Sequence, residues 1–182
     1  KIAPALPAGA LVSDVGSSKR AAADALAAAL PDHAVIPAHP VAGTENSGPD
    51  SGFAGLFVNR WCILTPPPGA EQAAVERLAA FWRLLGANVE TMSAEHHDLV
   101  LGITSHLPHL IAYTLVGTAD EFSQVTLSEV LQFSAGGFRD FTRIAASDPT
   151  MWRDVFLANK DAVLEMLGRF NEDLAMLTRA IR

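Results

Sequence analysis

Hydrophobic and polar positions follow two different patterns along the chain, and the pattern changes near residue 93. Before that point, four short apolar runs predict β-strands, at residues 10–15, 34–38, 60–65 and 88–92. Two stretches between them predict helices: Ala-rich residues 17–30, and residues 70–85, which place Val75, Leu78, Trp82 and Leu85 on one face and end at Gly86. Alternating strands and helices are typical of a parallel sheet covered by helices.

From residue 93 onward no period-two run follows, and the remaining segments predict helices to the end of the chain. The last helix is expected from about Asn159. Its apolar positions recur every three or four residues, at Val163, Leu167, Phe170, Leu174, Leu177 and Ile181. Packing within one chain explains such a stripe, but a helical half this small would gain stability by pairing with a second copy. We therefore expect a homodimer formed through the helical half.

The fold class predicted is α/β followed by all-α, with domains at residues 1–92 and 93–182. The first domain shows four strands and no early G-x-G-x-x-G turn. A complete doubly wound domain would need roughly two more βαβ pieces of about 30 residues each. We infer that an N-terminal segment is missing and that residues 1–92 are the C-terminal part of such a domain.

Composition narrows the class of protein. The chain has 182 residues, is 49% hydrophobic and 18% charged, and carries a formal charge of -7, which argues against nucleic acid as a partner because phosphate binding needs a basic face. Its one cysteine, Cys62, lies in an apolar run, which predicts a core position and suits a reducing cytoplasm. No signal peptide is expected, since alternating Ala and Pro follow Lys1.

Residues 99–118 contain no charged side chain over a length that could cross a membrane. Ser105, His106 and His109 lie in the middle of this run, and polar groups are costly at bilayer depth. We expect a buried helix and no membrane partner.

Two polar clusters follow predicted strands, at residues 13–19 (SDVGSSK) and 39–48 (HPVAGTENSG). Ligands bind at the carboxyl ends of strands in open α/β sheets, so both clusters are expected at one crevice. In the first, Gly16 allows a tight turn and Ser17 or Ser18 is expected to cap the next helix, whose amides would face a ligand. Taken alone, that cluster favours a helix cap and nothing more.

The second cluster begins with His39. An imidazole titrates near neutral pH, at about 6.5 in unperturbed peptides, so His39 is able to accept a proton. Pro40 restricts the backbone of His39 to extended geometry and so fixes where the ring leaves the strand. A lone loop histidine is nevertheless more often structural than catalytic.

The helical half has two polar clusters of its own. In SHLPH, His106 and His109 share a helical face, and with His96 and His97 they suggest zinc. We discount zinc, because no thiolate and few carboxylates stand at ligand spacing, and we predict no metal site. In residues 136–154, Arg139, Arg143 and Arg153 could bind a carboxylate, or could pair with Asp140, Asp148 and Asp154 on the surface.

The four clusters together resemble the prephenate and arogenate dehydrogenases of tyrosine biosynthesis, from about Leu11 to the C-terminus. The family pattern is D-x-G-S-x-K, H-P-x-A-G-T-E, S-H-L-P-H and F-x-D-F-T-R-I-A-x-S-D-P-x-M-W-R-D, and all four motifs occur here in order. Their order and spacing make chance a poor explanation.

The resemblance implies a Rossmann-type dinucleotide-binding domain followed by a helical dimerisation domain, with the active site in the cleft between them. It implies an oxidoreductase that transfers hydride from a cyclohexadienol, prephenate or arogenate, to NAD or NADP and releases carbon dioxide. Two alternatives stay open: another Rossmann-type hydroxyacid dehydrogenase, although those typically have a lysine where this chain has His39, and a dimeric binding module without catalysis.

On the nucleotide side, the resemblance makes His39 the residue that hydrogen-bonds the substrate hydroxyl, which needs a neutral ring, so activity should fall in acid. It places Ser17 beside the nicotinamide, orienting His39, with Asp14 and Gly16 lining the cofactor side. The phosphate-binding glycine turn of the family has no counterpart in this chain, so the isolated chain is expected to bind dinucleotide poorly.

On the substrate side, the resemblance makes Arg143 the residue that binds a substrate carboxylate. His109 and Ser105 would line the same pocket, and Thr44 and Glu45 would lie on a loop that closes over it.

Overall fold

The structure is a computed structural model that describes residues 3–44, 46, 48–125 and 132–182. Contacts group the chain into two compact units. The first contains Lys1–Gly43, Gly52–Leu101 and Leu157–Asn159, and the second contains Thr44–Ser51, Gly102–Phe156 and Lys160–Arg182.

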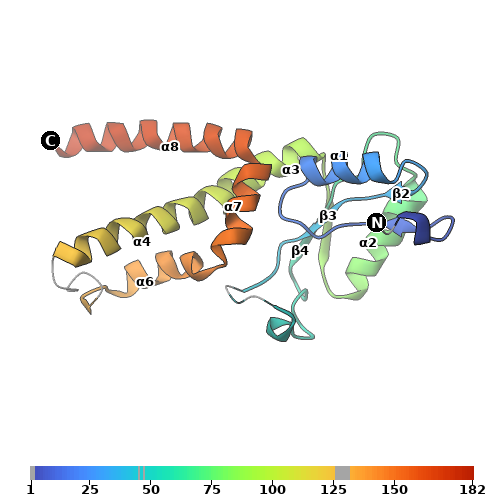
Figure 1. The fold of residues 1–182 in the computed structure, drawn as a ribbon, viewed down its shortest axis with the longest axis horizontal. Coiled ribbons are helices and arrows are strands. Elements are labelled where there is room, and N and C mark those ends of the chain that lie inside the picture. Colours follow the sequence, from blue (N-terminus) through green and yellow to red (C-terminus); the bar gives the residue numbers. More distant parts are fainter. Residues whose placement is uncertain (1–2, 45, 47, 126–131) are drawn as a thin grey trace. The chain divides into compact units, whose positions relative to one another are not determined.

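In its described residues, the first unit contains short strands, the helices α1, α2 and α3, and the end of α7 (Pro149–Ala158) (Figure 1). In chain order, the strands and the first three helices are β1 (Leu11–Val12), α1 (Arg20–Ala29), β2 (Ala34–Val35), β3 (Ala38–Pro40), β4 (Trp61–Leu64), α2 (Gln72–Leu84), β5 (Asn88–Thr91) and α3 (Ala94–Leu101). The four predicted strand regions and the two predicted helices between them are confirmed. The region 34–38 is divided into two strands, β2 and β3.

The strand pairings differ from the parallel sheet predicted. Strands β1 and β2 are parallel, and so are β4 and β5, but β3 and β4 are antiparallel, with His39 opposite Ile63. A parallel pair needs a crossover helix, and α1 and α2 provide one for each parallel pair. Between β3 and β4 the described residues form only a short 3-10 helix, Pro49–Ser51, so the chain returns antiparallel. The prediction of a wholly parallel sheet is therefore wrong at β3.

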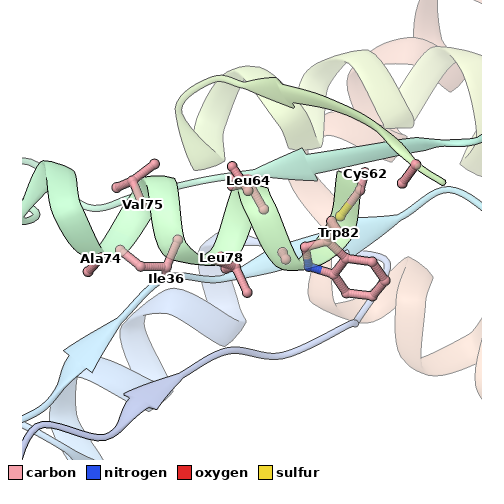
Figure 2. Packing of buried hydrophobic residues seen from close by; sticks show 10 residues of the cluster. Ile36, Cys62, Leu64, Ala74, Val75, Leu78 and Trp82 are labelled. Atoms are coloured by element: carbon pink, nitrogen blue, oxygen red, sulfur yellow. The ribbon is translucent and has the colours of Figure 1, made fainter. Parts of the chain in front are cut away.

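Helix α2 packs its apolar face on the strands to form the core of this unit (Figure 2). The core includes Ile36, Cys62, Leu64, Val75, Leu78 and Trp82. Burial raises the pKa of the Cys62 thiol to about 12, so the thiol stays protonated and the predicted core role of Cys62 is confirmed. Leu85, predicted on the same face, is instead more than a third exposed.

Gly86 ends α2, as the sequence predicts. Its φ of 87° lies in the left-handed region, and its N–H bonds the carbonyl of Arg83 at 2.9 Å. A Cβ atom on Gly86 would lie 3.3 Å from Cα of Val58, so both conformation and space favour glycine here.

In the described residues of the second unit, all the regular secondary structure is helical. It contains a π-helical turn (Gly102–His106), α4 (Leu107–Val125), α6 (Gly136–Thr142), a 3-10 turn (Arg143–Ala146), most of α7 (Pro149–Ala158), and α8 (Lys160–Ile181). Helix α4 contacts both α6 and α8. The predicted change to helices after residue 93 and the long last helix are confirmed.

The apolar helix at residues 99–118 is less buried than predicted. Leu107 and Ala112 are buried, but Ile103 is 48% exposed and Leu115 is 37% exposed. The prediction of a buried helix is wrong for these two side chains, because the other helices of the chain cover the π-helical turn and α4 only in part. By length and composition alone, Ala94–Phe122 could cross a membrane, which is weak evidence because core helices pass the same test.

Candidate active site

The turn between β1 and α1 is tied to the residue that precedes His39. Asp14 accepts hydrogen bonds from the N–H of Gly16 (2.9 Å), from Nζ of Lys19 (2.5 Å) and from the N–H of Ala38 (3.3 Å). Lys19 Nζ also donates to the carbonyl of Ala38 at 2.7 Å. Asp14 and Lys19 thus hold both backbone polar groups of Ala38, which fixes the backbone entering His39.

Lys19 is fully buried. Burial lowers the pKa of its ammonium group, and the hydrogen bond and charge of Asp14 oppose this shift. A buried cation is tolerated only when paired and hydrogen-bonded, as it is here. A Cβ atom on Gly16 would lie 3.0 Å from Oδ2 of Asp14, so a larger residue there would require this carboxylate to shift.

Helix α1 begins differently from the prediction. Its N-cap residue is Lys19, without a side-chain cap. The N–H groups of Lys19 and Arg20 instead donate to the two carboxylate oxygens of Asp98, at 2.7 Å and 3.0 Å. The prediction that Ser17 or Ser18 caps this helix is wrong, because a carboxylate from α3 occupies the site that the helix N-terminus favours for an anion.

His39 is the first member of a buried row of three side chains. Its Nδ1 lies 2.8 Å from Nε2 of His97, and Nδ1 of His97 lies 2.8 Å from Oδ1 of Asp98. Their exposed fractions are 7%, 0% and 3%. Burial alone would raise the pKa of Asp98, but hydrogen bonds from His97 and from the amides of Arg20 and Lys19 outweigh it and lower the pKa.

From the sequence, His97 stood out only as a possible zinc ligand, and no role was predicted for Lys19 or Asp98. One signal could have found His97 and Asp98: the pair follows β5 by a few residues, at the edge where open α/β sheets place their functional groups.

Three further residues were predicted for the site: Ser17 beside the cofactor, and Thr44 and Glu45 on the loop that follows His39. Ser17 is half-buried in the turn before α1. Thr44 is exposed, and its hydroxyl accepts a hydrogen bond from the N–H of Asn46 at 3.2 Å. Glu45 lies outside the described residues.

In the second unit, His109 stacks on Trp152 with ring centroids 3.5 Å apart and planes 19° apart. Burial lowers the pKa of His109, the positive charge of Arg143 lowers it further, and a 2.9 Å contact from Nδ1 to the carbonyl of Ser105 opposes both. The structure therefore gathers Ser105, His109 and Arg143 as predicted neighbours, with Ser105 contributing its backbone oxygen. Trp152 adds an aromatic face.

Of the three arginines considered for carboxylate binding, Arg153 forms a surface ion pair with Asp154 at 2.7 Å, and both side chains are mostly exposed. The ion-pair interpretation therefore holds for Arg153. Arg143 lies in the 3-10 turn Arg143–Ala146, where its charge acts on His109.

The residues of the β1–α1 turn fit one end of a dinucleotide. Val15 is 63% exposed beside half-buried Ser17, which offers an apolar surface and a hydroxyl suited to a nicotinamide ring. The first amides of α1 are bonded to Asp98, so they are not available to a pyrophosphate. The described residues of this turn therefore suit the nicotinamide end of a dinucleotide and not its pyrophosphate.

Comparisons with known proteins match almost the whole chain to one family of enzymes. Residues 1–91 match the family model described as "Prephenate dehydrogenase, nucleotide-binding domain", and residues 93–182 match "Prephenate dehydrogenase, dimerization domain". The cyclohexadienyl dehydrogenase of Zymomonas mobilis is 45% identical over 180 residues, which are 99% of this chain and 61% of that protein.

Several solved structures are similar over 99% of this chain. A prephenate dehydrogenase from Aquifex aeolicus, in complex with hydroxyphenyl propionate and NAD+, has a TM-score of 0.91 and 38% identity, and the match covers 62% of that chain. A Synechocystis arogenate dehydrogenase has a TM-score of 0.82 and 27% identity, with 64% of that chain covered. The chain spans less than two thirds of the length of these relatives. It belongs to the prephenate dehydrogenase family.

Proposed function

We propose that the chain provides the catalytic histidine and the substrate-binding helices of a dehydrogenase that oxidises prephenate or arogenate, with NAD or NADP as the hydride acceptor. The observation that carries the proposal is the placement of His39, which is buried in β3. The residue before it, Ala38, is fixed by hydrogen bonds from its N–H to Asp14 and from Lys19 to its carbonyl. The names of the relatives, prephenate, arogenate and cyclohexadienyl dehydrogenase, support the same chemistry.

In the proposed reaction, the substrate hydroxyl donates a hydrogen bond to a neutral His39 ring. As the C–H bond beside the hydroxyl breaks, the electron pair leaves with the hydrogen as hydride, and His39 draws the hydroxyl proton toward itself. Loss of the ring carboxylate as carbon dioxide then completes an aromatic ring. NAD(P), when bound, supplies the acceptor for the hydride.

The second unit has the groups suited to a substrate carboxylate. Arg143 carries a planar guanidinium able to bind a carboxylate through two parallel hydrogen bonds. His109, kept neutral by its lowered pKa, adds a polar ring beside it without adding a charge, and Ser105 fixes that ring through its carbonyl. We assign carboxylate binding to Arg143, with His109 and Ser105 supporting it.

The test is the reduction of NAD and of NADP with prephenate and with arogenate, using the protein expressed from its complete gene. His39→Asn is expected to lower kcat by about 10²- to 10⁴-fold, the usual contribution of a proton-accepting group. His33→Asn changes a histidine outside the site and should leave kcat unchanged. If neither substrate reduces either cofactor, the proposed reaction is wrong, and the two alternatives, another hydroxyacid dehydrogenase and a binding module, remain. If His39→Asn retains full kcat, His39 has no catalytic role.

We also propose that the second unit forms a homodimer. The matching family model is that of a dimerization domain, and the apolar stripe of α8 grows more exposed toward its end. Val163 is 5% exposed, Leu174 is 44%, Leu177 is 60% and Ile181 is 86%. A partner chain would bury the exposed part of the stripe.

A further inference from the structure

In the row His39, His97 and Asp98, the contacts determine which nitrogen of each imidazole ring carries the proton when both rings are neutral. Asp98 is ionised near neutral pH, because its pKa is lowered from the ordinary value of an Asp carboxyl, so its oxygens only accept hydrogen bonds. At 2.8 Å from that oxygen, Nδ1 of His97 must donate, which leaves Nε2 of a neutral His97 as an acceptor. At 2.8 Å from this acceptor, Nδ1 of His39 must donate in turn.

A neutral His39 with its proton on Nδ1 has its lone pair on Nε2. That is the tautomer required to accept a hydrogen bond from a substrate hydroxyl. The opposite tautomer would present an N–H group to that hydroxyl, and the ring could not take its proton. The orientation of the whole row therefore bears on chemistry at His39.

Three further contacts hold Asp98 in place. Its two carboxylate oxygens receive the amides of Lys19 and Arg20, at the positive end of the α1 dipole, and its backbone carbonyl accepts from Nδ2 of Asn159 at 2.7 Å. Lys19 also contacts Asp14 and the carbonyl of Ala38 through its side chain. One residue thus connects the anchored carboxylate to the backbone of the catalytic strand.

The geometry points to His97 and Asp98 as positioning residues that hold His39 in the Nδ1-protonated form, with Nε2 as the proton acceptor. The effect of this tautomer on turnover rests on the proposed function, whereas the tautomer itself follows from the contacts in the row. The competing explanation is a buried polar row that contributes stability only. The two explanations differ in what happens to the tautomer of His39 when the acceptor at His97 is removed.

The first measurement is nitrogen-15 NMR of the histidine rings in the protein expressed from its complete gene, without substrate. The resonance of His39 is identified by its loss in His39→Asn. We expect the wild-type ring to carry its proton on Nδ1. A wild-type His39 protonated on Nε2 overturns the inference, whatever the variants do.

The second measurement uses three variants. His97→Leu removes the acceptor, and we expect the Nδ1 preference of His39 to be lost, with kcat falling about 10²-fold and KM little changed. This loss is smaller than the roughly 10⁴-fold seen when a triad histidine is forced into the wrong tautomer. His97→Gln places an amide oxygen near the position of Nε2 and should restore most of kcat and the Nδ1 preference. The matched control is His96→Leu, at the exposed neighbouring residue of the same helix, which should change neither.

The outcomes separate the inference from the proposed function. If no substrate is turned over but the tautomer of His39 responds to His97→Leu and not to His96→Leu, the proposed function fails and the positioning role stands. If His39→Asn abolishes turnover while His97→Leu leaves kcat and the tautomer unchanged, the proposed function stands and the positioning role is overturned. If His97→Leu does not fold, the wild-type tautomer and the behaviour of His97→Gln decide: a Gln variant that folds but loses the Nδ1 preference counts against the inference.

Discussion

Asp98 illustrates how one buried carboxylate serves structure and chemistry together. It ends the row that begins at His39, and it binds the amides of Lys19 and Arg20 that start α1. Because its charge is satisfied by hydrogen bonds, its pKa is lowered in the folded protein. A depressed carboxyl pKa adds stability above the unfolded-state pKa, and that stability is lost as pH falls through the folded-state pKa.

Asp98→Asn is therefore expected to destabilise the fold by about 1–3 kcal/mol near neutral pH, the cost of leaving a buried donor unsatisfied. The difference from wild type should be constant above about pH 4, the ordinary range of an Asp carboxyl, and should shrink at lower pH as Asp98 is protonated in the wild type. Denaturant unfolding at several pH values measures it. Asp154→Asn, at a mostly exposed carboxylate, is the control and should have little effect at any pH. A difference that stays constant down to strong acid would contradict the assigned shift.

At this scale, the motifs predicted that His109 and Arg143 lie near each other, which the structure shows. The catalytic role that the motifs give to His39 stays a prediction. The sequence did not predict the partner of His39, because His97 lies 58 residues away and no local spacing connects them. It also misassigned the cap of α1, since a local serine is visible in the sequence and a distant carboxylate is not.

At the scale of elements, local periodicity was sufficient to predict the helices but not to predict how the strands pair. The spacing of Val75, Leu78 and Trp82 fixes the buried face of α2 because that face is a property of one segment. The direction in which β3 pairs depends on the path of the chain between Pro40 and Trp61, which periodicity does not describe. The end of α2 was predictable, since a left-handed residue after a helix is usually glycine.

Gly86→Ala is expected to destabilise the protein by roughly 1–3 kcal/mol, the usual cost of a non-glycine residue held in a left-handed conformation, with a further cost from the contact at Val58. Gly69→Ala is the matched control: its φ of 81° is similar, but a Cβ atom there would meet nothing within 4 Å. The difference between the two variants in thermal or denaturant unfolding isolates the steric part. Equal effects would mean that Val58 moves away without cost.

At the scale of the whole molecule, the helical unit leaves an apolar surface on α8 that one chain does not cover. Leu174 is 44% exposed, and Leu177 and Ile181, nearer the end of the helix, are each more than half exposed. Scattered apolar residues on a surface need no explanation, but a continuous stripe along one helix indicates an interface. The sequence predicted the stripe, and the structure adds that its exposed part begins beyond Phe170.

The homodimer proposal is tested by replacing two residues of the stripe with charge. Leu174→Glu together with Leu177→Glu should weaken self-association by at least ten-fold, since two unpaired carboxylates would have to be buried in an apolar interface at a cost well above 1.4 kcal/mol. Sedimentation over a range of concentrations measures it. Arg179→Glu, away from the stripe on the same helix, changes the net charge by the same amount and is expected to leave the dimer intact, which separates loss of the apolar contact from simple charge repulsion. If both variants dissociate alike, repulsion explains the result, and if the double variant stays dimeric, the interface lies on another surface and the stripe of α8 needs a different partner.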